Sequence, residues 1–176
     1  MFELNHIYNT DCMIGMKELP NDYIPLILTD IPYDGVNRDD GGLRKLDKGK
    51  ADILTFNLQD FLKELYRISN GTIIIFCGVG SVSEISNFFE TKKGTVRTLV
   101  WEKTNPSPMN GKQVYLSGIE LGVWFKKLGK GTYNGNCKNT VLRYPNGSSK
   151  NHPTEKNHDL LKDLINTNSK IGGLNI

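Results

Sequence analysis

Short apolar runs and amphipathic stretches alternate along most of this chain. The apolar runs are rich in Ile, Val and Leu, are bounded by Gly, Asp or Asn, and cover residues 26–29, 72–77, 95–101 and 118–125. Continuous apolar runs of this length are typical of strands that are buried on both faces. They therefore predict the centre of a sheet that is covered on both sides.

Helices are predicted between the first of these strands. Apolar side chains recur at positions 58, 61, 62 and 65, which share one face of a helix, and Asn57 precedes them as a cap. Ser81 and Glu84 have the spacing of a capping box at the start of a second helix. Strands separated by helices in this way predict an α/β fold with a mainly parallel sheet and helices on both faces.

Two polar stretches interrupt the alternation. Residues 34–50, rich in Gly, Asp, Lys and Arg, directly follow a strand and predict a long mobile loop. Residues 127–151, rich in Gly, Asn, Lys and Ser, predict an irregular surface segment. The whole chain, residues 1–176, has the length of a single domain.

Composition and charge narrow the class of protein. Hydrophobic residues make up 38% of the chain, which is a globular share, and no run approaches the roughly 20 apolar residues of a membrane helix. The first residues lack the basic-then-apolar layout of a signal peptide, so we expect a soluble, cytoplasmic protein. The net charge of +3 permits a polyanionic partner without requiring one.

The spacing of cysteines and histidines bears on disulfides and metals. The cysteines at 12, 77 and 137 are odd in number and far apart, which fits neither a disulfide framework nor a metal site. The histidines at 6, 152 and 158 lack the spacing of zinc ligands. We therefore expect no metal.

Candidate chemistry follows the first apolar run. Asp30, Pro32 and Tyr33 stand together where the strand meets a loop, and ligands of open parallel sheets bind at the carboxyl ends of strands. Asp and Pro are also common turn residues, so the tetrapeptide alone favours an ordinary turn.

The wider context resembles the DNA amino-methyltransferases. Residues 7–12 resemble the opening of these enzymes, and residues 30–33 resemble their Asp-Pro-Pro-Tyr segment, with Ile31 in place of the first proline. Residues 103–108 resemble their Lys-x-Asn-Pro-x-Pro segment.

Two later segments continue the resemblance. Residues 117–120 are similar to a strand of the family that carries Ser and Glu, and residues 152–156 are similar to its His-Pro-Thr-x-Lys element, with Asn157 where proline is usual. The segments follow one another in the order of the permuted, β-type group, in which the catalytic segment precedes the cofactor segment. The resemblance implies a Rossmann-like methyltransferase fold.

The resemblance also implies a reaction, methyl transfer from S-adenosylmethionine to an exocyclic amine of a flipped base in DNA. Such an amine is a poor nucleophile, and Asp30 together with the backbone carbonyl of Ile31 would accept its hydrogens. Pro32 would constrain the turn. Tyr33 would offer a flat face to the extruded base. No Pro-Cys pair exists in the chain, which argues against methylation at a ring carbon through a cysteine nucleophile.

Further site residues come from the same resemblance and, for the DNA side, from the basic loop after Tyr33. Those on the cofactor side are Asp11, Cys12, Asp30, Thr154 and Lys156. Those expected to contact DNA are Arg38, Arg44, Lys45, Lys103 and Asn105. Simpler interpretations stay open, since Asp11 also fits a turn, Thr154 a helix cap, and the basic loop residues stand among aspartates.

The end of the chain departs from the family pattern. The family continues into a strand that ends in Asp-x-Phe-x-Gly-x-Gly, whereas this chain finishes at residues 171–176. The resemblance therefore implies an incomplete cofactor half, weak cofactor binding and little or no turnover in the isolated chain. A natural truncation, a remnant, and a split gene whose fold is completed by a second chain or a dimer partner all fit this ending.

Several functions remain open on sequence alone. Asp at position 30 favours adenine N6 as the target, whereas Ser there would favour cytosine N4. Cytosine-N4 methylation by the same fold is the nearest alternative. A non-catalytic DNA-binding remnant or a subunit completed by another chain is the next, and a generic α/β nucleotide-binding module is the last.

Overall fold

The apolar runs form the middle of one five-stranded sheet. The computed structural model describes residues 3, 5–33, 54–108, 111–147 and 155–170. The strands are β1 Ile24–Asp30, β2 Ser69–Cys77, β3 Gly94–Lys103, β4 Ile119–Lys127 and β5 Val141–Tyr144. Their order across the sheet is β1-β2-β4-β3-β5.

The sheet is mixed. β1 pairs in parallel with β2, and β3 with β5, while β4 runs antiparallel to both of its neighbours, β2 and β3. β4 is antiparallel because the chain leaves β3 through a loop and pairs directly back onto it. The predicted α/β fold is confirmed, with four strands pointing the same way and one reversed.

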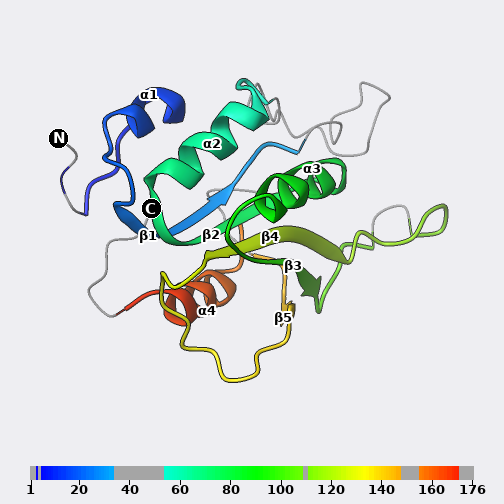
Figure 1. Ribbon diagram of the computed structural model, residues 1–176. Helices are drawn as coiled ribbons and strands as arrows, with labels where there is room; N and C mark the ends of the chain where they lie inside the picture. The colour runs from blue at the N-terminus through cyan, green and yellow to red at the C-terminus, as the bar shows by residue number, and fades with distance from the viewer. Residues whose placement is uncertain (1–2, 4, 34–53, 109–110, 148–154, 171–176) are drawn as a thin grey trace.

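Helices cover both faces, as predicted. Helices α1 Cys12–Lys17, α2 Leu58–Ile68 and α3 Val79–Glu90 lie on one face of the sheet, and α4 His158–Asn168 lies on the other (Figure 1). A large apolar cluster fills the first face, where Phe61 and Leu62 of α2 and Phe89 of α3 are buried. A smaller cluster joins Leu160 and Leu164 of α4 to the second face.

Helix starts show how far local sequence decides the fold. Asn57 caps α2 as predicted, and its side chain accepts from the backbone N–H of Asp60 at 3.1 Å. The predicted capping box at Ser81 is wrong. α3 already begins at Val79 after Gly78, and the Ser81 amide donates to the carbonyl of Gly78.

One strand appears where an irregular segment was predicted. The prediction for residues 127–151 is wrong at β5, whose residues pair in parallel with the end of β3. Its four residues give too short a pattern to predict a strand, and hydrogen bonds to β3 supply the order. The indole N–H of Trp101 also donates to the carbonyl of Tyr144 at 2.9 Å. The loop predicted at residues 34–50 lies outside the described residues.

A search of the described part of the chain for a long apolar helix finds none that could cross a membrane.

Candidate active site

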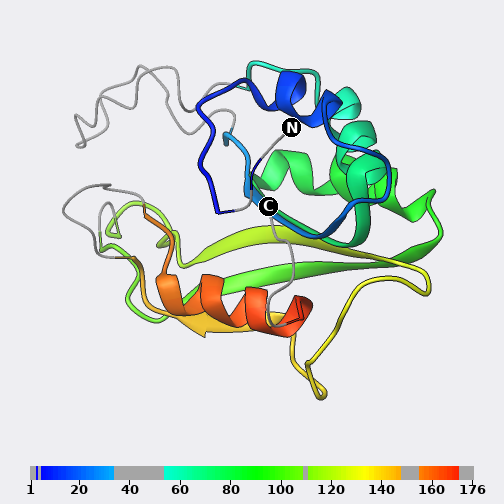
Figure 2. The same cartoon turned by 90° about the vertical axis from the view of Figure 1, so that its left-hand side faces the viewer.

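Three strands carry charged side chains at the same end of the sheet, where the parallel strands have their carboxyl ends. β1 ends at Asp30 and β3 ends at Lys103, while the antiparallel β4 brings Glu120 to the same end near its start. Asp30 pairs with Phe76 and Glu120 pairs with Trp101, and both aromatics belong to the core on the α4 face. Figure 2 shows the loop between β3 and β4 on the same side of the molecule as the segment that leads into α4.

Lys156, just before α4, joins these side chains. Its Nζ lies 2.9 Å from Asp30 Oδ2, 2.8 Å from Glu120 Oε2 and 3.2 Å from the hydroxyl of Tyr33. Its side chain is only 11% exposed. An ammonium has three N–H donors, and here three acceptors surround it.

Glu120 is the second junction. Its Oε1 accepts an ion pair from Lys103 Nζ at 2.8 Å, and its Oε2 accepts from the Tyr33 hydroxyl at 3.3 Å as well as from Lys156. We call Asp30, Tyr33, Lys103, Glu120 and Lys156 the strand-edge network. Two cations and two carboxylates balance each other in it, so charges that are largely withdrawn from water stay compensated.

Aromatic rings surround the ammonium of Lys156. It lies 4.8 Å from the ring centroid of Phe76, 5.4 Å from that of Tyr33 and 5.8 Å from that of Trp101. Lys103 lies 5.2 Å from the Trp101 ring on its own strand. Ring faces attract cations, and these rings also limit the access of water to the ion pairs.

The two carboxylates respond to this site in opposite ways. Burial raises the pKa of Asp30 above its ordinary value, and the charge of Lys156 only partly offsets the rise. Burial acts on Glu120 too, but the charge of Lys156 and hydrogen bonds from Lys103 and Lys156 outweigh it and hold its pKa below the ordinary value. Asp30 is also the more open group, at 47% exposed against 21% for Glu120. It is therefore the carboxylate that an incoming polar group can reach.

The neighbouring tyrosine and cysteine stay protonated at neutral pH. Burial, and then the charges of Asp30 and Glu120, raise the pKa of Tyr33 far above its ordinary value. Burial, and then the charge of Asp30, raise the pKa of Cys77 to about 11. A thiol with that pKa is a poor nucleophile at neutral pH, in line with the absence of a Pro-Cys pair.

The strand-end tetrapeptide occupies this site. Ile31 is 3% exposed, and its amide donates to the carbonyl of Phe76 at 3.0 Å, which extends the β1–β2 pairing by one residue. Pro32 and Tyr33 follow, both partly buried. Of the residues singled out from the sequence, Asp30, Tyr33, Lys103 and Lys156 are brought together.

Asp11 and Cys12 are placed elsewhere, at the start of α1 on the opposite face of the sheet. The family resemblance also implies that Asp11 ends a short strand, which is wrong, since no strand precedes it among the described residues. Its Oδ1 accepts from the amides of Met13 and Ile14 at 2.8 and 3.2 Å and so caps the helix that Cys12 begins. The simpler interpretation of Asp11 was a turn residue, whereas the structure makes it the N-cap of α1, and a cofactor contact stays a prediction.

Asn105 has a local structural partner. Its Oδ1 accepts from the amide of Asn146 at 2.6 Å, and its carbonyl accepts from the Asn146 side chain at 2.9 Å. Asn105 thereby ties the β3–β4 loop to the segment after β5. Thr154, Arg38, Arg44 and Lys45 lie outside the described residues.

Glu120 was not among the site residues chosen from the sequence. A signal was present, because an acid stands near the start of an otherwise apolar strand and within the segment that resembles the Ser and Glu strand of the family. Its role at the junction of two lysines depends on the antiparallel direction of β4, which sequence pattern does not reveal.

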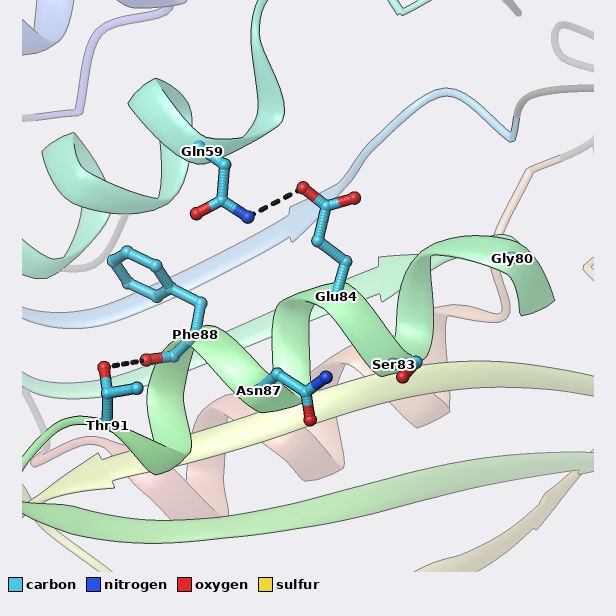
Figure 3. Close-up of a pocket in the computed structure, with 7 residues that line it drawn as sticks. All are labelled: Gln59, Gly80, Ser83, Glu84, Asn87, Phe88 and Thr91. Carbon is cyan, nitrogen blue, oxygen red and sulfur yellow. Dashed lines mark hydrogen bonds between the residues drawn. The ribbon is translucent and has the colours of Figure 1, made fainter.

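A separate hollow lies between α2 and α3 (Figure 3). Its lining residues are Gln59, Gly80, Ser83, Glu84, Asn87, Phe88 and Thr91. Gln59 donates to Glu84 across it at 2.7 Å, so the polar groups at its centre serve each other. It lies on the helical layer opposite α4, away from the strand-edge network.

Comparisons with known proteins find similarity to DNA methyltransferases. A family model described as DNA methylase matches residues 24–175. The Type II methyltransferase M.HinfI of Haemophilus influenzae is 27% identical over 151 residues, which is 77% of this chain and 42% of that protein. This chain thus spans less than half the length of that relative.

Solved structures share the fold. The crystal structure of the M1.HpyAVI-SAM complex has a TM-score of 0.65 at 24% identity, covering 93% of this chain and 76% of that one. The PvuII DNA methyltransferase, described as cytosine-N4-specific, has a TM-score of 0.62 at 14% identity, covering 96% and 71% respectively. At these identities the likeness concerns the arrangement of helices and strands.

Proposed function

The chain belongs to the DNA methylase family, and on that premise we propose that it transfers a methyl group from S-adenosylmethionine to an exocyclic base amine in DNA, with adenine N6 as the target. The observation that carries the proposal is the state of Asp30. This carboxylate stands half-exposed at the end of β1, fixed from one side by Lys156 and close to the ring of Tyr33.

The chemistry needs an acceptor for the hydrogens of the amine. The lone pair of an exocyclic amine is delocalised into the base, so hydrogen bonds to the N–H groups help to localise it on nitrogen. Asp30 offers carboxylate oxygens for this purpose, and the carbonyl of Ile31 follows it in the turn. As nitrogen gains the methyl group it must lose a proton, and a carboxylate whose pKa is raised by burial is suited to receive it.

Lys156 acts on Asp30 as a positioning residue. All three of its N–H donors have acceptors within the strand-edge network, so we assign its ammonium to holding Asp30 rather than to a cofactor contact. Its charge opposes the effect of burial on Asp30 and favours the ionised carboxylate that the amine needs. Lys156 also pairs with Glu120, so its positive charge is divided between the two carboxylates.

The base needs a flat surface once it leaves the duplex. Tyr33 is partly buried, and its hydroxyl is fixed by Glu120 and Lys156, so its ring cannot turn freely. Stacking of a base on an aromatic ring contributes about 1–3 kcal/mol. An ordered ring beside the acceptor carboxylate would hold the amine near Asp30.

The charge of the cofactor fits exposed carboxylates among the described residues. S-adenosylmethionine carries an ammonium and a sulfonium, both cationic, and when bound it supplies an activated methyl group. Exposed carboxylates complement such cations, and Asp11 and Asp30 are both of this kind. We assign Asp11, with Cys12 beside it and Thr154, to holding the cofactor.

DNA is the partner that this reaction requires. Lys103 stands at the foot of the β3–β4 loop, and Asn105 anchors that loop. We propose that both lie beside the bound DNA, together with Arg38, Arg44 and Lys45.

Identification of the product tests the proposal. The protein is incubated in excess over mixed-sequence DNA with labelled S-adenosylmethionine, so that even one slow turnover registers, and the DNA is digested to nucleosides for mass spectrometry. The expected product is N6-methyladenine. N4-methylcytosine would move the target to the other exocyclic amine, and 5-methylcytosine would contradict the proposal. An absence of labelled nucleoside would favour the alternative of a non-catalytic chain or of a subunit completed by another chain.

A further inference from the structure

The loop between β3 and β4 presents an apolar tip to solvent. Tyr115 is 101% exposed, and Val114, Leu116 and Ile119 beside it are also exposed. Consecutive exposed apolar side chains are uncommon on a surface that meets only water, and they mark sites of contact with another molecule.

The described part of this loop has internal structure that holds the tip outward. The amide of Gly111 donates to the carbonyl of Pro108 at 3.1 Å, and the amide of Gly118 donates to the carbonyl of Leu116 at 2.8 Å. Leu116 packs against Gly111 so closely that a Cβ there would lie 2.8 Å from its side chain. Leu116 is therefore packed in part against the loop, while Tyr115 is fully exposed.

The foot of the loop is part of the strand-edge network. The amide of Lys103 donates to the carbonyl of Gly118 at 2.8 Å, and Glu120 follows two residues later. The loop projects beyond the strand ends in Figure 1. A macromolecule that placed one group at Asp30 would therefore meet this loop at the flank of the site.

The charge of the loop suits a polyanion. Between Thr104 and Gly118 the sequence contains Lys112 and no Asp or Glu, so this stretch carries a net positive charge. An apolar tip on a basic support is the arrangement of side chains that proteins insert between DNA base steps.

We propose that Tyr115 enters the DNA duplex and fills the gap that the extruded base leaves behind. The inference rests on the proposed function, because a base must leave the duplex to reach Asp30. The ring of Tyr115 would stack on the base pairs that the departure exposes, with Val114 and Ile119 covering the rim of the gap. Filling the gap opposes the return of the base, so Tyr115 stabilises the extruded state without touching the reacting atoms.

A duplex with a ready-made gap tests this without knowledge of a recognition sequence. Two short fluorescent duplexes of identical sequence are compared by anisotropy titration, one intact and one with a single abasic tetrahydrofuran residue. The wild-type protein should bind the gapped duplex about tenfold more tightly, as expected for one aromatic stacking contact. Tyr115→Ala should abolish this preference while affinity for the intact duplex stays within about twofold, since one stacking side chain is not a phosphate contact.

Matched variants control for folding and for aromatic character. Tyr115→Phe should keep the preference, because the ring face survives. Tyr23→Ala removes another exposed tyrosine, next to the amino end of β1 at the opposite edge of the sheet, and should also keep it. Melting temperatures of the three variants should match that of the wild type, since these rings are exposed.

Each contrary outcome has a definite meaning. Equal wild-type affinity for the two duplexes, or a preference that survives Tyr115→Ala, overturns the inference. A wild-type dimer that Tyr115→Ala converts to a monomer with the preference unchanged assigns the tip to a contact between copies, which also overturns it. Methyl transfer measured in parallel separates the two proposals. Methylation without a gap preference leaves the function standing, while a Tyr115-dependent preference without methylation supports the inference and counts against the function.

Discussion

Lys156 is the residue that contacts most of the other side chains in the candidate site. A lysine that is 11% exposed is costly unless its charge is compensated, and here Asp30 and Glu120 share the compensation. Because the two carboxylates share one cation, a change to either alters the pKa of the other. Glu120, which also holds Lys103, has a lowered pKa and retains its charge more easily than Asp30, whose pKa is raised.

The acid limb of the pH–activity profile should report Asp30. In the proposed reaction the ionised carboxylate is the acceptor, so methyl transfer should rise with pH through a midpoint above the ordinary Asp value of 3.8. The charge of Glu120 raises the pKa of Asp30, so Glu120→Gln should move this limb to lower pH. Lys156→Gln removes the charge that lowers it and should move the limb to higher pH. Single-turnover rates across pH would check both directions, and shifts of the same sign in the two variants would contradict the assignment.

At the scale of single elements, the start of helix α4 fixes the position of Lys156. Asn157 caps this helix directly after Lys156, and its side chain accepts from the amide of Leu160 at 3.0 Å. On the other face of the sheet Asn57 caps α2 in the same way. Both helices have eleven residues, so the chain offers a matched pair of caps at different distances from the site.

The two caps should differ in function and agree in stability. Asn157→Ala and Asn57→Ala should each reduce the free energy of unfolding by about 1 kcal/mol, because each removes one capping hydrogen bond. Only Asn157→Ala should also lower the rate of methyl transfer, since it loosens the backbone that carries Lys156. Denaturant titrations and single-turnover rates on both variants would check this. Equal losses of activity would show that the cap acts through global stability alone.

Local sequence accounts for part of the elements and pairing accounts for the rest. The cap of α2 could be predicted because donor and acceptor lie three residues apart. β5 and the reversed direction of β4 could not, since hydrogen bonds to β3 decide them and β3 is distant in sequence from β5. At the start of α3 the capping-box spacing at Ser81 was misleading, because the backbone of Gly78 already begins the helix.

At the scale of the whole molecule, the fold joins distant segments at one edge. Asp30, Tyr33, Lys103 and Lys156 could be chosen from the sequence, since strand ends and family segments mark them. Their mutual contacts could not, because Tyr33 and Lys156 are 123 positions apart and meet only through the sheet and α4. Asp11 shows a second limit of prediction from sequence. Its short side chain accepts a hydrogen bond from a backbone amide two residues away, and the family resemblance does not reveal that local contact.

Binding of DNA by the whole molecule should depend on salt. The net charge of +3 is small, so we expect the attraction to come from the individual cations proposed to contact DNA. The logarithm of the affinity for an intact duplex should fall linearly with the logarithm of salt concentration, with a slope set by the phosphates contacted. Lys103→Gln should reduce that slope, as measured by anisotropy at several salt concentrations. Affinity that is indifferent to salt would exclude these cations from the contact.

The most direct test compares two aspartates that are about equally exposed and that each pair with a largely buried lysine. Asp30, at the carboxyl end of β1, pairs with Lys156 at 2.9 Å. Asp22, just before the amino end of β1, pairs with Lys127 at 2.9 Å. The aspartates are 47% and 50% exposed, and the lysines 11% and 10%. Methyl transfer under single-turnover conditions and melting temperature are measured for Asp30→Asn and Asp22→Asn. We expect similar melting temperatures, with methyl transfer reduced about a hundredfold or more in Asp30→Asn and unchanged in Asp22→Asn. Wild-type rates in Asp30→Asn, with only its melting temperature lowered, would make Asp30 a structural turn residue and contradict the account.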